Sequence, residues 1–258
     1  MEAIALSHLT WIARVTNFLP EQLTDFRMGR CNADSIADLV STMEDARHDR
    51  DAVMLVLLDV KAAFDILPHS VIHEALSRLG VTGPLLAFVP AFLQGRTFRV
   101  HVGGQLSSAQ PVAAGVSQGS MLSPFLFNLV MARLPTSLRF RSSYRERCSV
   151  NAGDVALWVR GTPRRIRSMR TSLHRALDAA QAYLSSTSLT LSPAKTEALL
   201  YHPEGYGHIS PHCGSVAGPG EVSRPIDRPA SHMASCGDGP PASSTKNRPG
   251  SSASPGRG

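Results

Sequence analysis

An uninterrupted apolar run at residues 52–58 (AVMLVLL) constrains the fold of this chain more than any other stretch. The run is rich in β-branched and aliphatic residues and too short to cross a bilayer, so it predicts a strand buried on both faces of a sheet. Asp59 follows at once and places a carboxylate where the strand leaves the buried layer. Because an aspartate there is more often a turn former or a helix cap, the neighbouring sequence has to decide its role.

Helical and strand patterns surround this strand. Apolar residues at helical spacing predict helices over residues 1–18, 34–48, 70–79, 84–93, 123–134 and 164–184. The helix at 34–48 is expected to turn one face inward, formed by Ile36, Leu39, Val40 and Met43. Residues 98–102 predict a half-exposed strand, followed by a turn at residues 103–104 and a partner strand. Hairpins are predicted at residues 148–159 and 189–201. This order differs from a doubly wound plan and predicts an α+β fold, an antiparallel sheet with helices on one face.

The composition changes near residue 203. Residues 203–258 hold nine of the 18 prolines and ten of the 20 glycines and show no hydrophobic periodicity. Such a segment buries too little apolar surface to offset the entropy of ordering it. We therefore predict a disordered Pro/Gly/Ser-rich tail at 203–258, preceded by a folded region at 51–202 and a smaller segment at 1–50.

Charge and cysteine usage indicate the class of partner and the cellular compartment to expect. The net charge of +6 weakly favours a polyanionic partner. The four cysteines show no C-x-x-C spacing, which favours a reducing compartment, cytoplasm or nucleus, over a disulfide framework or a zinc site. Without a recognisable signal peptide or transmembrane segment, we expect an intracellular protein with no membrane partner. The sequence does not determine an oligomeric state.

Residues 58–65 (LDVKAAFD) resemble the first catalytic motif of the reverse transcriptases of non-LTR retrotransposons. In that family the motif's aspartate binds two Mg²⁺ ions, and the aromatic residue five positions later lies under the nucleotide sugar and excludes or tolerates its 2′-hydroxyl. The resemblance implies that Asp59 is a metal ligand and Phe64 the sugar gate. Without the motif, Phe64 would be interpreted as an ordinary core aromatic residue.

A second motif occupies residues 114–124 (AGVSQGSMLSP). Its two glycines around Gln118 allow a backbone to approach a ligand closely, and the loop leads into a helix N-terminus, although a plain turn has the same composition. The segment is similar to the family's nucleotide and template loop, G-V-P-Q-G-S-x-L-S-P, with Ser117 where proline is usual. The resemblance implies that Gln118, Gly119 and Ser120 face the incoming nucleotide and the templating base.

The third motif departs from the family. Residues 151–154 (NAGD) stand where the family has Y-A-D-D in a hairpin turn, so Gly153 replaces the aspartate that completes the metal site. Two-Mg²⁺ chemistry needs carboxylates that hold both ions within about 4 Å of each other. Asp154 remains the candidate for a second ligand beside Asp59, but strand alternation predicts that it points to the other side of the turn. We therefore expect weak or absent DNA synthesis.

Three further signals are weaker. Residues 189–197 (LTLSPAKTE) resemble a later motif that implies a role for Lys195 near the pyrophosphate leaving group, and a surface lysine is an equal alternative. Residues 26–30 (FRMGR) resemble the family's fingers segment. This resemblance makes Arg27 and Arg30 candidates for contact with phosphate. The last long helix carries five arginines, a pattern that favours a solvated face over a binding groove: Arg164, Arg165, Arg167, Arg170 and Arg175.

The resemblance extends over residues 1–202. It implies a right-hand polymerase palm at 51–202 and partial fingers at 1–50, with Mg²⁺ as cofactor and an RNA template, a DNA primer and dNTPs as partners. One alternative is a catalytically silent retroelement remnant or nucleic-acid-binding relic. Another is an ordinary basic α+β binding domain, which is disfavoured because three motifs occur in the family's order and spacing.

Overall fold

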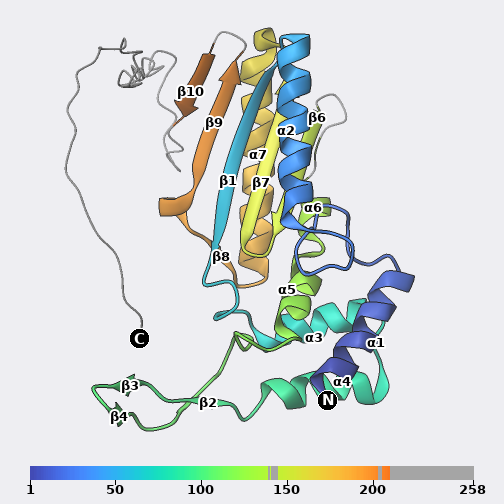
Figure 1. Ribbon diagram of the computed structural model, residues 1–258, viewed down its shortest axis with the longest axis vertical. Coiled ribbons are helices and arrows are strands. Elements are labelled where there is room, and N and C mark those ends of the chain that lie inside the picture. Colours follow the sequence, from blue (N-terminus) through green and yellow to red (C-terminus); the bar gives the residue numbers. More distant parts are fainter. Residues whose placement is uncertain (139, 141–144, 203–204, 210–258) are drawn as a thin grey trace, which may run out of the picture. The chain divides into compact units, whose positions relative to one another are not determined.

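A computed structural model describes residues 1–138, 140, 145–202 and 205–209. At its centre lies an antiparallel sheet with the strand order β10-β9-β1-β7-β6 (Figure 1). The strands are β1 (Ala52–Lys61), β6 (Arg145–Asn151), β7 (Asp154–Gly161), β9 (Glu197–His202) and β10 (Gly205–Ile209). The short strand β8 (Thr190–Leu191) pairs with the last residues of β1. The predicted strand at 52–58 is thus confirmed as the centre of the sheet, and it continues to Lys61.

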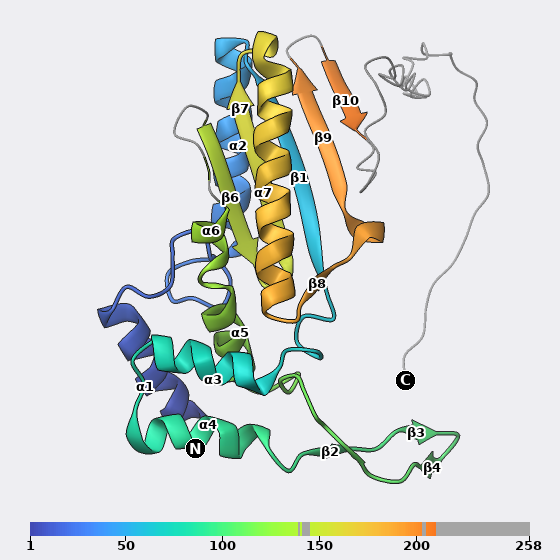
Figure 2. The ribbon, with the colours of Figure 1, turned by 180° about the vertical axis from the view of Figure 1, so that it is seen from behind.

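Two helices pack on opposite faces of this sheet (Figures 1 and 2). On one face, α7 (Ile166–Ser186) buries Met169 and Leu173 in the same cluster as Met54 and Val56 of β1. On the other face, α2 (Asn32–Asp49) packs on part of the sheet and leaves the rest open. The predicted α+β class is therefore confirmed, with α2 as an addition to the expected single helical layer.

The predicted inner face of α2 is confirmed for Leu39 and Met43, which pack against the sheet, and wrong for its other two residues. Ile36 and Val40 are 56% and 45% exposed, whereas Thr42 and Ala46 are buried. The reason is the contact with Trp158 of β7, which donates its indole N–H to the Thr42 hydroxyl at 3.3 Å and packs against the small Ala46. Helical periodicity alone could not set this rotation, because Trp158 lies more than a hundred residues away in sequence.

Helices cluster near the end of the sheet where β1 leaves it (Figure 1). They are α1 (Glu2–Val15), α3 (His69–Arg78), α4 (Gly83–Leu93), α5 (Ser123–Met131) and α6 (Leu134–Ser137). The most deeply buried is α5, and α3 packs against both α4 and α5. Two short ladders extend from this cluster, one of β2 (Thr97–Phe98) with β5 (Gln110–Pro111) and one of β3 (His101–Val102) with β4 (Gln105–Leu106).

The predicted start of a disordered tail at residue 203 is wrong for residues 205–209, which form the edge strand β10 beside β9. Pairing of an edge strand uses backbone hydrogen bonds and needs little apolar patterning, so the composition did not reveal it. The remainder of the predicted tail, residues 210–258, lies outside the described residues. Within the described part, no helix is long and apolar enough to cross a membrane.

Candidate active site

Asp59 of β1 lies directly across the ladder from Asp154 of β7. The Val60 N–H donates to the Gly153 carbonyl at 2.8 Å, so the two aspartates form a non-hydrogen-bonded pair, the narrower type, with Cβ atoms about 4.5–5.5 Å apart. Opposed residues of antiparallel strands direct their side chains to the same face. The prediction that Asp154 points to the other side of the turn from Asp59 is therefore wrong. Its face is set by the pairing of β7 with β1, which alternation along β7 alone does not reveal.

Both aspartates line a cavity of about 520 Å³ on the part of the sheet that α2 leaves open. The first turns of α2 form one wall with Asn32, Ser35 and Ile36. This position explains why Ile36 is exposed, because it borders the cavity and not the sheet. Further polar groups around the aspartates are Ser149, Asn151, Lys195 and Glu197.

Two opposed carboxylates repel each other unless a cation lies near them. Lys195 supplies one, since its Nζ lies 3.3 Å from Asp59 Oδ1. The 3-10 turn η2 (Pro193–Lys195) brings it there, and the preceding Ser192 donates its N–H to the Asp59 carbonyl at 2.8 Å. Because Lys195 is exposed, this ion pair contributes about 0–1 kcal/mol and its ammonium group is free to move.

The hairpin turn between β6 and β7 does not need glycine at position 153. Ala152 adopts the left-handed region with φ 50°, an unfavourable conformation for a residue with a side chain, while Gly153 does not. A Cβ at Gly153 would lie 3.7 Å from Ala63 Cβ and from the Val60 carbonyl, an ordinary contact distance. The fold therefore has room for a side chain where the family carries its metal-binding aspartate.

The loop after β1 and the loop at residues 114–120 are joined by backbone contacts. The Val116 N–H donates to the Phe64 carbonyl at 2.7 Å, and the Gly115 N–H donates to the Leu67 carbonyl at 2.8 Å. His69 Nε2 lies 2.9 Å from the Gly115 carbonyl, a hydrogen bond that requires the proton on Nε2. Gly115 is required here, because it has φ +86° and a Cβ would lie 2.8 Å from the Phe64 carbonyl.

The side chains predicted to contact the nucleotide have different surroundings. Phe64 is half-buried and stacks on Phe127 with ring centroids 4.9 Å apart. Gln118 is exposed and donates from Nε2 to Asp65 Oδ1 at 2.9 Å. The adjoining Gly119 is exposed as well. By contrast, Ser120 donates its hydroxyl to Glu2 Oε2 at 2.7 Å, so the structure turns this side chain toward α1.

Neither Arg27 nor Arg30 lines the cavity beside the two aspartates. Arg27 donates from Nη1 to the carbonyls of Pro20 and Leu23, at 2.6 and 3.1 Å, and so closes its own loop. Burial there lowers the pKa of Arg27, and the nearby charge of Arg30 lowers it further. Arg30 lies 3.9 Å from Glu21. The structure therefore does not bring these two arginines together with Asp59.

Arg160 of β7 is the main residue that sequence reasoning missed. Its side chain is 1% exposed and forms ion pairs with Asp45 at 3.3 Å, with Asp51 at 3.0 Å and with Asp49. These aspartates lie at the end of α2 and just after it, so the cluster fastens α2 to the sheet. The sequence signal that could have revealed this cluster is the spacing of Asp45 and Asp49 on one helix face, together with a charged residue at the end of the apolar strand β7.

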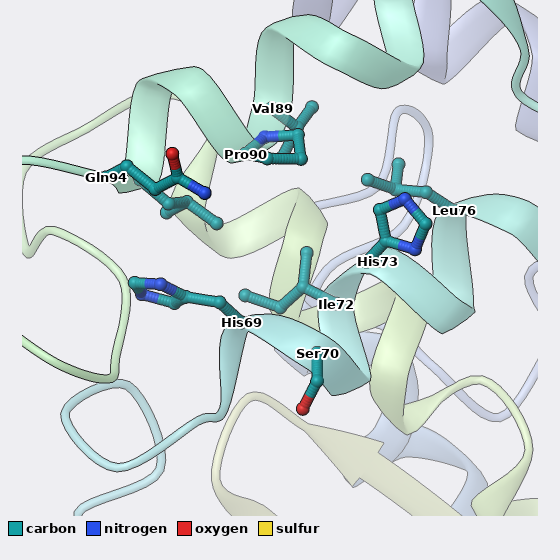
Figure 3. A pocket seen from close by; sticks show the side chains of 9 residues that line it. His69, Ser70, Ile72, His73, Leu76, Val89, Pro90 and Gln94 are labelled. Carbon is teal, nitrogen blue, oxygen red and sulfur yellow. The ribbon is translucent and has the colours of Figure 1, made fainter.

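A second cavity, of about 220 Å³, lies between α3 and α4 (Figure 3). Most of its lining is apolar, including Ile72, Leu76 and Val89, with His69 and Gln94 at one side and His73 at the other. None of these residues lines the aspartate cavity. His69 connects the two regions, because its ring also holds the loop at 114–120.

Both the sequence and the fold of this chain are similar to those of known proteins. A family model described as reverse transcriptase (RNA-dependent DNA polymerase) matches residues 1–232. The RNA-directed DNA polymerase from mobile element jockey of Drosophila melanogaster is 28% identical over 197 residues, which are 76% of this chain and 21% of that protein. A Pol polyprotein from type-1 retrotransposable element R2 of Popillia japonica is 39% identical over 94 residues, 36% of this chain and 13% of that one.

The chain thus spans about a fifth or less of the length of these relatives. Among solved structures, apo telomerase from Candida tropicalis, truncated from its C-terminal domain, aligns with a TM-score of 0.56 at 9% identity, over 77% of this chain and 40% of that one. Telomerase from Candida albicans, in complex with a fragment of telomeric RNA, aligns with a TM-score of 0.55 at 13% identity, over 84% and 39%. At these identities the likeness establishes the fold.

Proposed function

Because this chain belongs to the reverse transcriptase (RNA-dependent DNA polymerase) family, we propose that it is the polymerase core of a non-LTR retrotransposon reverse transcriptase whose activity is weakened at Gly153. In this proposal it copies an RNA template by extending a DNA primer with dNTPs. Residues 51–202 correspond to the palm and residues 1–50 to part of the fingers. The observation that carries the proposal is the Asp59–Asp154 pair on the open face of the sheet.

The donor set fits one Mg²⁺. Asp59 and Asp154 offer carboxylates on one face, and Asn151 Oδ1 is a buried acceptor with no hydrogen-bond partner among the described residues. Mg²⁺ is commonly held by one or two carboxylates and completes its octahedron with water and substrate phosphates. When bound, it would supply charge neutralisation at the triphosphate. Within the described residues, no group of three His, Cys, Asp or Glu side chains could hold a metal.

Each predicted site residue would then have its own role in binding the nucleotide and the template. Phe64, held by its stacking on Phe127, would support the nucleotide sugar, while Gln118 and Gly119 border the incoming nucleotide. Lys195 would leave Asp59 and move toward the triphosphate, because its ammonium group is exposed and weakly held. Ser120 would act through the loop that it stabilises. Arg27 and Arg30 are the last two residues predicted to bind the nucleotide or the template. They would stabilise the fingers segment and contact phosphate from there.

Gly153 is the reason to expect impairment. A two-ion site needs a bridging carboxylate at this position, and loss of such a ligand commonly removes several kcal/mol of transition-state stabilisation, about a thousandfold in rate. The same substitution favours the second candidate, a catalytically silent remnant that still binds nucleic acid. The two candidates differ in whether restoring the carboxylate restores synthesis.

Primer extension on an RNA template with a DNA primer, dNTPs and Mg²⁺ tests the proposal. We expect Gly153→Asp to raise the extension rate by at least about a hundredfold, and the matched Gly153→Asn variant, which adds a side chain without charge, to leave it low. Rapid synthesis by the unmodified chain would contradict the impairment. If Gly153→Asp neither extends nor binds the primer–template, the polymerase proposal itself fails.

A further inference from the structure

Five exposed arginines gather where the last long helix begins. They lie in the 3-10 turn η1 (Pro163–Arg165) and in the first turns of α7, the helix that covers one face of the sheet (Figure 2), and they are not among the residues that α7 buries. We call this group the arginine surface, and its members are Arg164, Arg165, Arg167, Arg170 and Arg175. The polymerase proposal assigns them no role.

These arginines lack acidic partners. Within the described part of the chain, none of the five guanidinium groups forms an ion pair or a hydrogen bond. Asp178 lies exposed one turn beyond Arg175 and is not paired with it. Arg164, Arg167 and Arg170 follow one another at i, i+3 spacing, where like charges repel, and the first turn of α7 holds no acidic residue. The cluster therefore opposes the stability of its own helix, and an anionic ligand would offset that effect.

The chemistry of the surface points to one class of ligand. All five residues are arginines, whose planar fork binds phosphate oxygens in pairs. From Arg164 to Arg175 the helix extends about 16 Å, over which one nucleic-acid strand carries about five phosphates. No large apolar side chain is exposed between residues 163 and 186, so the surface has no group to stack on bases or to enter a bilayer.

We propose that the arginine surface binds the phosphate backbone of a nucleic acid without reading its sequence. This goes beyond the proposed polymerase function and does not depend on it. The buried side of α7, with Met169 and Leu173, packs on the sheet face opposite to Asp59 and Asp154. Along β7, Gly161 lies about 23 Å from Asp154 at 3.3 Å per residue. The bound strand is therefore a different segment from any primer–template at the aspartate pair.

Fluorescence anisotropy tests this proposal. The labelled probes are a 20-nucleotide RNA, a single-stranded DNA of the same sequence, and duplex DNA. EDTA is present so that Mg²⁺ at Asp59 plays no part. The test variant combines Arg167→Gln, Arg170→Gln and Arg175→Gln. The matched control combines Arg14→Gln, Arg47→Gln and Arg133→Gln, which are exposed elsewhere and remove the same charge. A third variant changes the three test residues to lysine, and circular dichroism checks that all variants are folded.

We expect the test variant to bind at least about tenfold more weakly, with the slope of log K against log salt smaller by about 2–3. The control should stay within about threefold of the unmodified chain. The lysine variant should bind more tightly than the glutamine variant and less tightly than the unmodified chain, because lysine keeps the charge but lacks the planar fork. The RNA and DNA arms show which strand is preferred. Equal losses in test and control variants, or no loss in either, would overturn the proposal. So would binding of phosphatidylserine vesicles that depends on these arginines while nucleic-acid binding does not.

Discussion

Asp59 of β1 and Asp154 of β7 oppose each other on neighbouring strands and share one face of the sheet, although 95 positions separate them in sequence. Such a pair of like charges is unfavourable by about 0.2–1 kcal/mol, and the exposed ammonium group of Lys195, which lies beside Asp59 alone, offsets only part of this repulsion. The same geometry therefore makes the pair a local weakness in the free protein, and under the proposed function it becomes a binding site when Mg²⁺ is present. These two consequences can be measured without any catalytic assay.

The first prediction concerns the repulsion between Asp59 and Asp154 and its relief by Mg²⁺. In EDTA, Asp154→Asn should raise the free energy of unfolding by about 0.2–1 kcal/mol, because it removes one of the two opposed charges. In millimolar Mg²⁺ the gain should shrink or reverse, because the ion binds the folded unmodified chain and stabilises it by mass action. Urea unfolding with and without Mg²⁺ measures both values. Asp178→Asn on α7 is the control and should respond equally in both buffers.

The second prediction compares two glycines. Gly153→Ala should be neutral or stabilising by up to about 1 kcal/mol, because its backbone is not left-handed and a Cβ meets only ordinary contacts. Gly115→Ala should lower the free energy of unfolding by about 2 kcal/mol or more, because its φ is +86° and the Cβ collides with the backbone around Phe64. Urea unfolding of both variants gives the comparison. Similar losses at the two positions would contradict the hairpin geometry.

The third prediction concerns the buried arginine. Arg160→Met should lower the free energy of unfolding by about 1.5–3 kcal/mol, because it removes the guanidinium that holds α2 to the sheet, while Asp45 and Asp49 stay in contact with water. The control is Arg147→Met, whose exposed ion pair with Asp38 should contribute less than about 1 kcal/mol. Chemical unfolding of both variants separates the buried cluster from the surface pair.

The fourth prediction concerns pH. Burial raises the pKa of the Cys148 thiol from 9.0 to about 12. The unfolded chain then loses this proton at lower pH than the folded one, so the stabilisation is complete below about pH 9 and is lost as pH rises from 9 to 12, by about 1.4 kcal/mol per unit. Cys148→Val should remove this component, so its unfolding free energy relative to the unmodified chain should rise over that range. A constant difference would contradict the burial of the thiol.

Local motifs predicted much of the candidate site. The strand that carries Asp59 and the loop that carries Gln118 were placed from residues adjacent in sequence, and the resemblance to non-LTR reverse transcriptases is confirmed by the family match and the relatives. The contact of Lys195 with Asp59 also agrees with the motif that suggested it. The inferences that failed concern side chains oriented by contacts with distant segments, namely the face that Asp154 occupies and the burial of Ile36 and Val40 on α2.

The amino-acid sequence by itself determined the buried strand at 52–58, most of the helices and the replacement of a carboxylate by Gly153, because each depends on local pattern or identity. Only the tertiary structure decided which face Asp154 occupies, how α2 turns on Trp158 and where Arg160 finds its partners. The physical reason is common to all three. Strand register and helix rotation are set by contacts between distant segments, and a shift of one residue moves a side chain to the opposite face of the sheet.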